Sequence, residues 1–167
     1  MVANGNIYAL GGYSISGGNG GVVVATVYYS HIDGNTGALG AFSTATSMPA
    51  ERAHGGAAAY NGYMYFVGGS SQSGAITSTV YYAKINSDGS LGSWLTSANA
   101  VPTARYVHAV VAASGYLYAM GGCSSQLPVT LQCSGLLNDT QYTALNADGS
   151  LAGWSAHASF ATHRETY

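Results

Sequence analysis

Few residues of this chain could carry out acid–base chemistry. Of its 167 residues, Lys and Arg number 4 and Asp and Glu number 6, so charged residues make up 6%, against about 25% in a typical soluble domain. A hydrolytic site built on paired carboxylates needs two acids at a defined separation. Five of the six acids instead recur at turn positions or beside arginines: Asp33, Asp88, Asp148, Glu51 and Glu165. We therefore expect no catalytic residues and no enzymatic activity.

The five histidines do not form a metal-binding motif. They are His31, His54, His108, His157 and His163, and no two have a metal-ligand spacing such as H-x3-H. His54 and His108 follow Arg52 and Arg105 closely, at the beginnings of predicted strands. Both are candidates for lining the mouth of a central channel, and the alternative is that each is hydrogen-bonded within its own strand. We expect no metal and no cofactor.

Cys123 and Cys133 are the only cysteines, and they bracket one predicted loop. An even number of cysteines within one loop predicts a disulfide that closes it, and the alternative is a pair of free buried thiols. A disulfide, few lysines and one N-x-T sequence at Asn138 together favour a secreted or cell-surface protein. The signal segment would then lie upstream in a longer parent chain.

The charge and hydropathy patterns exclude two classes of partner. The formal net charge is −2 and no basic cluster is present, so binding of nucleic acid through phosphate neutralisation is not expected. No apolar run approaches the roughly 18 residues of a membrane-spanning helix. Hydrophobic residues nevertheless make up 47% of the chain, which is enough for a folded core.

Four short elements recur three times in the same order, so the chain is a repeat protein. The first element ends in a double glycine and occupies residues 4–12, 61–69 and 114–122. The second carries Tyr at its centre and occupies 25–33, 78–88 and 139–148. The third begins at an Asp-Gly turn and occupies 33–42, 88–94 and 148–154. The fourth ends in Arg and occupies 48–52, 101–105 and 160–164.

Each unit is expected to form four antiparallel strands and no helix. The segments are short, rich in Tyr and β-branched residues, and separated by Gly-containing turns, and none shows a 3.6-residue period. In the middle unit the predicted strands are 53–60, 63–67, 77–85 and 91–95. In the third they are 106–113, 116–120, 139–145 and 151–155, and in the first 6–10, 23–31 and 38–43. The first unit lacks a full counterpart of strand 53–60, because Met1 aligns with Ala58 and the chain is expected to begin at the end of that strand.

This pattern resembles the kelch family of β-propellers along essentially the whole chain. The residues that carry the resemblance in the middle unit are Pro49, Arg52, Tyr65, Gly68, Gly69, Tyr81, Tyr82 and Trp94. Their counterparts in the next unit are Pro102, Arg105, Tyr118, Gly121, Gly122, Tyr142 and Trp154. The chain departs from the family pattern at Phe42, where Trp is expected, and at Ala161, where Pro is expected. The resemblance implies an all-β fold of about three four-stranded, kelch-like propeller blades.

The predicted blades leave the propeller open. We assign one propeller segment, with a partial blade 1 at residues 1–47, blade 2 at 48–100, blade 3 at 101–159 and the start of the next at 160–167. Propellers typically need 4 to 8 blades to close. Either the chain is a fragment of a longer propeller, or identical copies join head to tail, with two copies giving a ring of six blades. The two explanations are compatible.

One face of the predicted propeller is the candidate binding surface. The loops after each Gly-Gly and the segments before each Arg converge there, and in kelch proteins this face commonly binds the partner. Its candidate ligand-binding residues are Arg52, Arg105, Arg164, Tyr13, Ser70, Ser71, Ser124, His54 and His108. The alternative for the arginines is a structural role, which their recurrence in every unit favours.

The expected function is a non-enzymatic interaction module that binds a protein or glycan. Tyr occurs 14 times, and this residue combines apolar area with a hydroxyl that suits recognition. One alternative is a self-assembling structural module without a ligand. A further alternative, implied only by the family resemblance, is a sugar isomerase or oxidase.

Overall fold

The computed structural model describes residues 1–15, 21–126 and 132–164, and every regular element in these ranges is a β-strand. Three antiparallel sheets have four strands each. The first contains β1 (Val2–Ala3), β2 (Asn6–Leu10), β5 (Val27–His31) and β6 (Ser43–Ala45). The second contains β7 (Gly56–Tyr60), β8 (Tyr63–Val67), β9 (Val80–Lys84) and β10 (Leu95–Thr96). The third contains β11 (Ala109–Ala113), β12 (Tyr116–Met120), β13 (Thr140–Ala144) and β14 (Ser155–His157).

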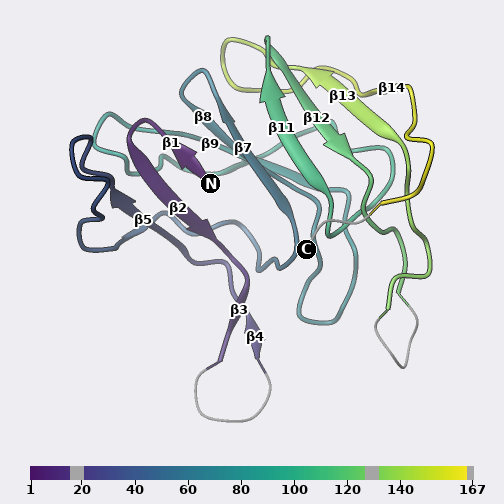
Figure 1. The fold of residues 1–167 in the computed structure, drawn as a ribbon, viewed down its shortest axis with the longest axis horizontal. Coiled ribbons are helices and arrows are strands. Elements are labelled where there is room, and N and C mark those ends of the chain that lie inside the picture. Colours follow the sequence, from purple (N-terminus) through teal and green to yellow (C-terminus); the bar gives the residue numbers. More distant parts are fainter. Residues whose placement is uncertain (16–20, 127–131, 165–167) are drawn as a thin grey trace.

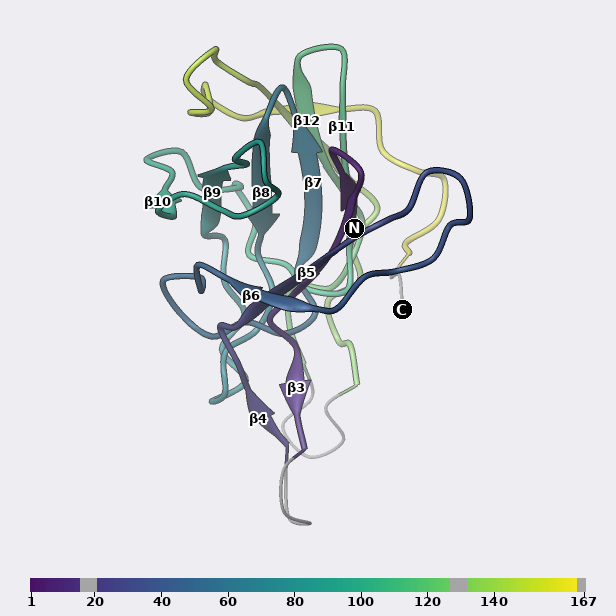
Figure 2. The same ribbon diagram turned by 90° about the vertical axis from the view of Figure 1, so that its left-hand side faces the viewer.

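The three sheets lie side by side in chain order, with the second sheet between the other two (Figure 1). A two-stranded hairpin, β3 (Tyr13–Ser14) and β4 (Val22–Val23), projects from the end of the first sheet (Figures 1 and 2). The predicted all-β class and four-stranded units are therefore confirmed. Among the described residues the sheets do not close into a ring.

The predicted strand bounds agree best with the observed ones where the local sequence pattern is strongest. Strands β2, β8 and β12 occupy the predicted ranges 6–10, 63–67 and 116–120. The outer strands β6, β10 and β14 begin later than predicted. The first residues of each predicted segment pair with the neighbouring chain only through a single bridge, such as Ile85↔Leu91. After this bridge Leu91 and Trp94 turn into the core between sheets, and the strand resumes only at Leu95.

The first unit has a two-residue inner strand, where the sequence predicts only the end of one. Strand β1 pairs with β2 through Val2↔Ile7, which is the counterpart of Ala59↔Met64 between β7 and β8. The short length of β1 agrees with the alignment of Met1 to Ala58. The prediction that residues 160–167 begin a further unit falls partly on 165–167, which lie outside the described residues.

The core is divided into two layers, one on each side of the second sheet. Between the first and second sheets, Tyr8 and Val27 pack with a set that includes Met64, Phe66 and Trp94. The second layer lies between the second and third sheets and includes Tyr65, Val67, Val80, Leu117 and Leu151. The second sheet is thus covered on both faces, so its strands are the most completely buried.

Tryptophans connect neighbouring sheets across these layers. The Trp94 indole N–H donates to the carbonyl of Thr46 (2.8 Å), and that of Trp154 donates to the carbonyl of Asn99 (3.1 Å). In both cases the acceptor lies just after the outer strand of the preceding sheet. The repeated tryptophan therefore joins one unit to the unit before it.

The double glycines make the same contact at every boundary between units. The second glycine donates its N–H to an arginine carbonyl in three hydrogen bonds: Gly12 to Arg52 (2.8 Å), Gly69 to Arg105 (2.9 Å) and Gly122 to Arg164 (2.7 Å). The first glycine packs so closely on the same carbonyl that an added Cβ would collide with it, at 2.4 Å for Gly68. Both glycines of the middle pair have positive φ, +64° and +87°, a region that favours glycine.

No helix in the described ranges is long and apolar enough to span a membrane.

Candidate ligand-binding pocket

A pocket of about 800 Å³ opens where loops of the three units come together. Strands β2, β8 and β12 end at this side of the molecule, and β7 and β11 begin there, because each pairs antiparallel with its neighbour. The loops that follow the double glycines therefore meet the segments that follow the arginines. The pocket is lined by Tyr13, His54, Gly55, Ser70, Gln72, Ser73, Gly74, Tyr106, Val107, His108, Gln126, Gln132 and Cys133.

Four of the predicted ligand-binding residues are brought together here: Tyr13, His54, Ser70 and His108. Ser71, Ser124 and the arginines are not among the lining residues. Tyr106 and Val107 were missed, although their position directly after Arg105 matches that of Ala53 and His54 after Arg52. That repeat equivalence is the signal by which they could have been found.

Three rings form a row along the pocket. The ring centroids of Tyr13 and His54 are 5.4 Å apart, and those of His54 and Tyr106 are 6.1 Å apart. The Ser70 hydroxyl lies 3.5 Å from Nδ1 of His54. The row runs from the β3–β4 hairpin to the third sheet, so residues from all three units contribute an aromatic wall with polar edges.

The backbone beneath this row has an unusual conformation. His54 and Val107 occupy equivalent repeat positions and have positive φ, +57° and +45°. The left-handed region is a clear outlier for a β-branched residue such as valine. A hydrogen bond from the Val107 N–H to the His54 carbonyl (2.8 Å) connects the two residues. Strained backbone of this kind persists where the surroundings hold it and is concentrated at ligand sites.

His108 is buried at the pocket wall without a hydrogen-bond partner for its ring. Its relative exposure is 5%, and neither Nδ1 nor Nε2 is paired among the described residues. Burial, followed by the nearby positive charge of Arg105, lowers the pKa of His108 to about 3. The ring is therefore neutral at physiological pH and offers one donor and one acceptor. Buried polar atoms are normally paired, so this ring is the clearest candidate for contact with a bound group.

The side chain of Arg105 is engaged within the protein. Arg105 is 0% exposed, and its guanidinium donates to both carboxylate oxygens of Asp139 (3.0 and 2.8 Å) and to the Gly121 carbonyl (3.0 Å). Arg52 donates to the Glu51 carbonyl and to the Tyr81 hydroxyl. At Arg105 the prediction of a ligand contact gives way to the structural alternative, because its donors are used inside the protein.

Asp139 is the internal partner of that buried charge. Its side chain is 23% exposed, and it also accepts a hydrogen bond from the Gln141 amide (2.7 Å). Burial alone would raise the pKa of Asp139, but the hydrogen bonds from Arg105 and Gln141 outweigh it and the pKa is lowered. The one acid outside the repeat pattern thus serves the fold.

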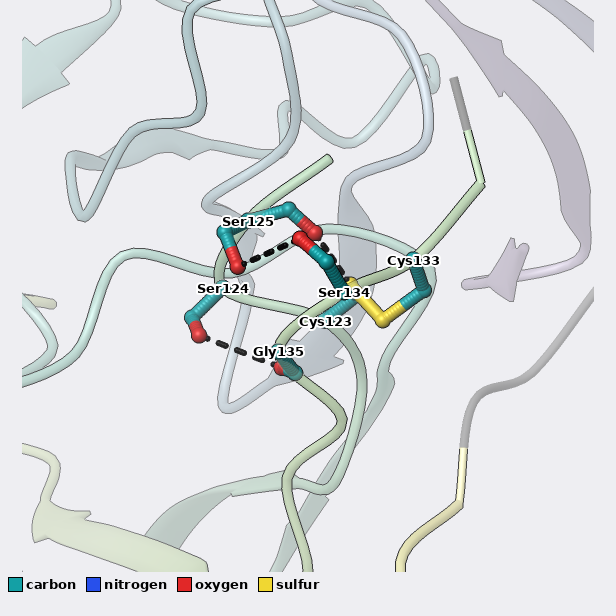
Figure 3. Close-up of a disulfide and its surroundings, with 6 residues drawn as sticks. All are labelled: Cys123, Ser124, Ser125, Cys133, Ser134 and Gly135. Atoms are coloured by element: carbon teal, nitrogen blue, oxygen red, sulfur yellow. Dashed lines mark hydrogen bonds between the residues drawn. A yellow bond between two sulfur atoms is a disulfide. The ribbon is translucent and has the colours of Figure 1, made fainter. Parts of the chain in front are cut away.

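The predicted disulfide is confirmed, and it borders the pocket. Cys123 is joined to Cys133 in the loop after the third double glycine (Figure 3). Nearby, the Ser124 hydroxyl donates to the Gly135 carbonyl (3.1 Å), and the Ser125 and Ser134 hydroxyls lie 3.0 Å apart (Figure 3). Cys133 and Gln126 both line the pocket, so the disulfide ties this part of the pocket wall to Cys123, just after β12.

No charged side chain is among the described lining residues of the pocket. Asp33, Asp88 and Asp148 lie in exposed turns, where backbone N–H groups donate to each carboxylate. For Asp33, these hydrogen bonds lower the pKa of its carboxyl. The pocket is consequently neutral, with hydroxyl, amide and imidazole groups as its polar contacts.

No protein-family model matches the chain, and no curated protein matches its sequence. The kelch resemblance therefore rests on the repeated residues and on the four-stranded sheets that they form.

Asp139→Ala is expected to destabilise the fold, because it leaves the buried Arg105 guanidinium without its counter-charge. The expected loss of unfolding free energy is about 3 kcal/mol, measured by urea denaturation. The control is Asp33→Ala in an exposed turn, with a much smaller expected loss. Equal losses in the two variants would contradict the structural role of the Arg105–Asp139 pair.

His108 is expected to make stability depend on pH below about 6.5. Because the folded-state pKa is lowered to about 3, the unfolded chain binds a proton first as the pH falls. The unfolding free energy then decreases between pH 6.5 and 3, by up to about 1.4 kcal/mol per pH unit. His108→Gln removes this contribution, so its unfolding free energy falls less steeply with decreasing pH. Identical slopes for the two proteins would show that folding does not lower the pKa of His108.

Proposed function

We propose that the chain is a segment of a kelch-like β-propeller that acts as a non-enzymatic binding module of a secreted or cell-surface protein. In this proposal its ligand is a neutral glycan, held in the pocket that loops of the three units line. The observation that carries the proposal is the neutral, aromatic lining of that pocket, contributed by all three repeat units.

The repeat geometry supports the propeller assignment. Three four-stranded antiparallel sheets follow one another in the chain, and the same glycine–arginine contact joins each unit to the next. Buried apolar layers separate successive sheets, as in the radial packing of propeller blades. The blade boundaries at residues 47/48, 100/101 and 159/160 remain predictions.

The pocket chemistry supports a glycan. One face of a sugar ring carries C–H groups that pack on an aromatic ring, and its edges carry hydroxyls that need donors and acceptors. The Tyr13–His54–Tyr106 row supplies the rings. The amide of Gln126, the hydroxyl of Ser73 and the unpaired ring of His108 supply the polar groups. This combination of apolar wall and few polar groups is typical of small-ligand sites.

The positions of the acids support binding rather than hydrolysis. Each described Asp lies in an exposed turn or, for Asp139, pairs with Arg105. A carboxylate pair of the kind used by glycoside hydrolases would have to flank the ligand. The contacts that the pocket offers to a ligand require no change of protonation state.

The disulfide supports a location outside the cytoplasm. Bonds such as Cys123–Cys133 persist in oxidising compartments and are rare where thiols are kept reduced. Glycans are abundant on the same side of the membrane, so the proposed ligand and the proposed location are consistent with each other.

Tyr13→Ala is expected to weaken glycan binding without changing the fold. A glycan array identifies the bound sugar, and calorimetry with that sugar then measures Kd for the wild type and the variant. Loss of the stacking ring should raise Kd about tenfold. Tyr13 is 54% exposed, so the melting temperature should remain that of the wild type.

Leu95→Ala is the matched control, because Leu95 is 53% exposed and does not line the pocket. Its Kd should equal that of the wild type. Peptides are included on the array. If only peptides bind, and Tyr13→Ala reduces their affinity, the ligand at this site is a protein and not a glycan. Binding that is equally reduced in both variants, or in neither, would refute the pocket as the site.

A further inference from the structure

Apolar residues of the first sheet are exposed at positions that are buried in the other two. Leu39 is 48% exposed, whereas its repeat equivalents Leu91 and Leu151 are each 4% exposed. Phe42 is likewise exposed, although its counterparts Trp94 and Trp154 contact the preceding unit. Together with Val2 and Tyr28, which are also exposed, Leu39 and Phe42 form what we call the leading face.

Apolar residues that follow or belong to the third sheet are exposed on the side that faces away from the second sheet. Phe160 is 37% exposed, whereas its equivalents Met48 and Val101 are 4% and 1% exposed beneath the following unit. Val111 is exposed too, although its equivalent Ala58 is buried between the second and third sheets. We call Val111, Tyr116 and Phe160, which are all exposed, the trailing face.

The two faces correspond to the two sides of a contact that the chain already makes twice. Between the first two sheets, Leu91 and Trp94 of the second unit pack in one cluster with Met48, Tyr8 and Val27. Between the second and third, Leu151 and Trp154 pack in one cluster with Val101 and Tyr65. At both boundaries between sheets, the repeat equivalents of the leading-face residues therefore already pack against the repeat equivalents of the trailing-face residues.

Within one chain the two faces cannot meet. The first and third sheets lie on opposite sides of the second, as β5 and β13 show in Figure 1. A second copy of the chain carries both faces in the required form. None of the residues that define the faces is charged, so their apposition places no like charges together.

We propose that the leading face of one copy docks on the trailing face of a second copy, and that the two copies close a ring of six sheets. The contact is heterologous, since different patches meet, and such contacts give closed rings when the rotation per copy closes. Six blades lie within the range of closed propellers. The proposal does not depend on a ligand, so it stands or falls separately from the glycan pocket.

Light scattering coupled to size-exclusion chromatography tests the ring. The expected mass is twice the 17.0 kDa of the chain. Leu39→Asp on the leading face and Val111→Asp on the trailing face should each give monomers, because every contact needs one face of each kind. Val22→Asp is the matched control, since Val22 is exposed on β4 outside both faces, and it should remain a dimer with an unchanged melting temperature.

Mixing the two variants identifies the type of contact. The intact trailing face of Leu39→Asp can meet the intact leading face of Val111→Asp, so an equimolar mixture should regain dimers that neither variant forms alone. A monomeric wild type at its highest soluble concentration would overturn the proposal. Dimers that survive in either single variant, or an open series of larger masses, would overturn the closed two-copy ring.

Discussion

The hydrogen bond from the second glycine of each pair to the arginine carbonyl of the next unit is the contact on which the arrangement of the sheets depends. It follows each of the three double glycines, at 2.7–2.9 Å. The first glycine leaves no room for a side chain beside the same carbonyl, so the two backbones approach as closely as peptide groups allow. This approach sets the spacing of neighbouring sheets, within which the Tyr, Leu and Trp side chains form two buried layers.

The same junction builds the pocket. Each arginine carbonyl accepts a hydrogen bond from a glycine, and residues just after Arg52 and Arg105, which are His54 and Tyr106 to His108, line the pocket. The loops after the glycines supply the opposite wall. The charge of Arg105 is neutralised within the protein by Asp139, so this arginine adds no charge to the surface that a ligand would meet.

Local patterns were sufficient to predict the strands β2, β8 and β12, the aspartate turns and the disulfide, since each is determined by residues close together in the chain. The Arg105–Asp139 pair joins residues 34 positions apart, and its burial follows from the packing of sheets rather than from the Arg motif. The membership of Tyr106 and Val107 in the pocket depends on a left-handed backbone at Val107, which valine does not predict. The outer strands β10 and β14 were displaced because Leu and Trp side chains turn toward the neighbouring unit.

The most direct test of the glycine–arginine contact compares two alanine substitutions. Gly68 and Gly62 both have positive φ (+64° and +77°), but an added Cβ would lie 2.4 Å from the Arg105 carbonyl oxygen at Gly68 and in open space at Gly62. Both variants carry the strain of a left-handed alanine, about 1 kcal/mol. Measured by urea denaturation, Gly68→Ala should lose at least about 2 kcal/mol more unfolding free energy than Gly62→Ala. Equal losses would show that the close approach of neighbouring units does not hold the sheets together.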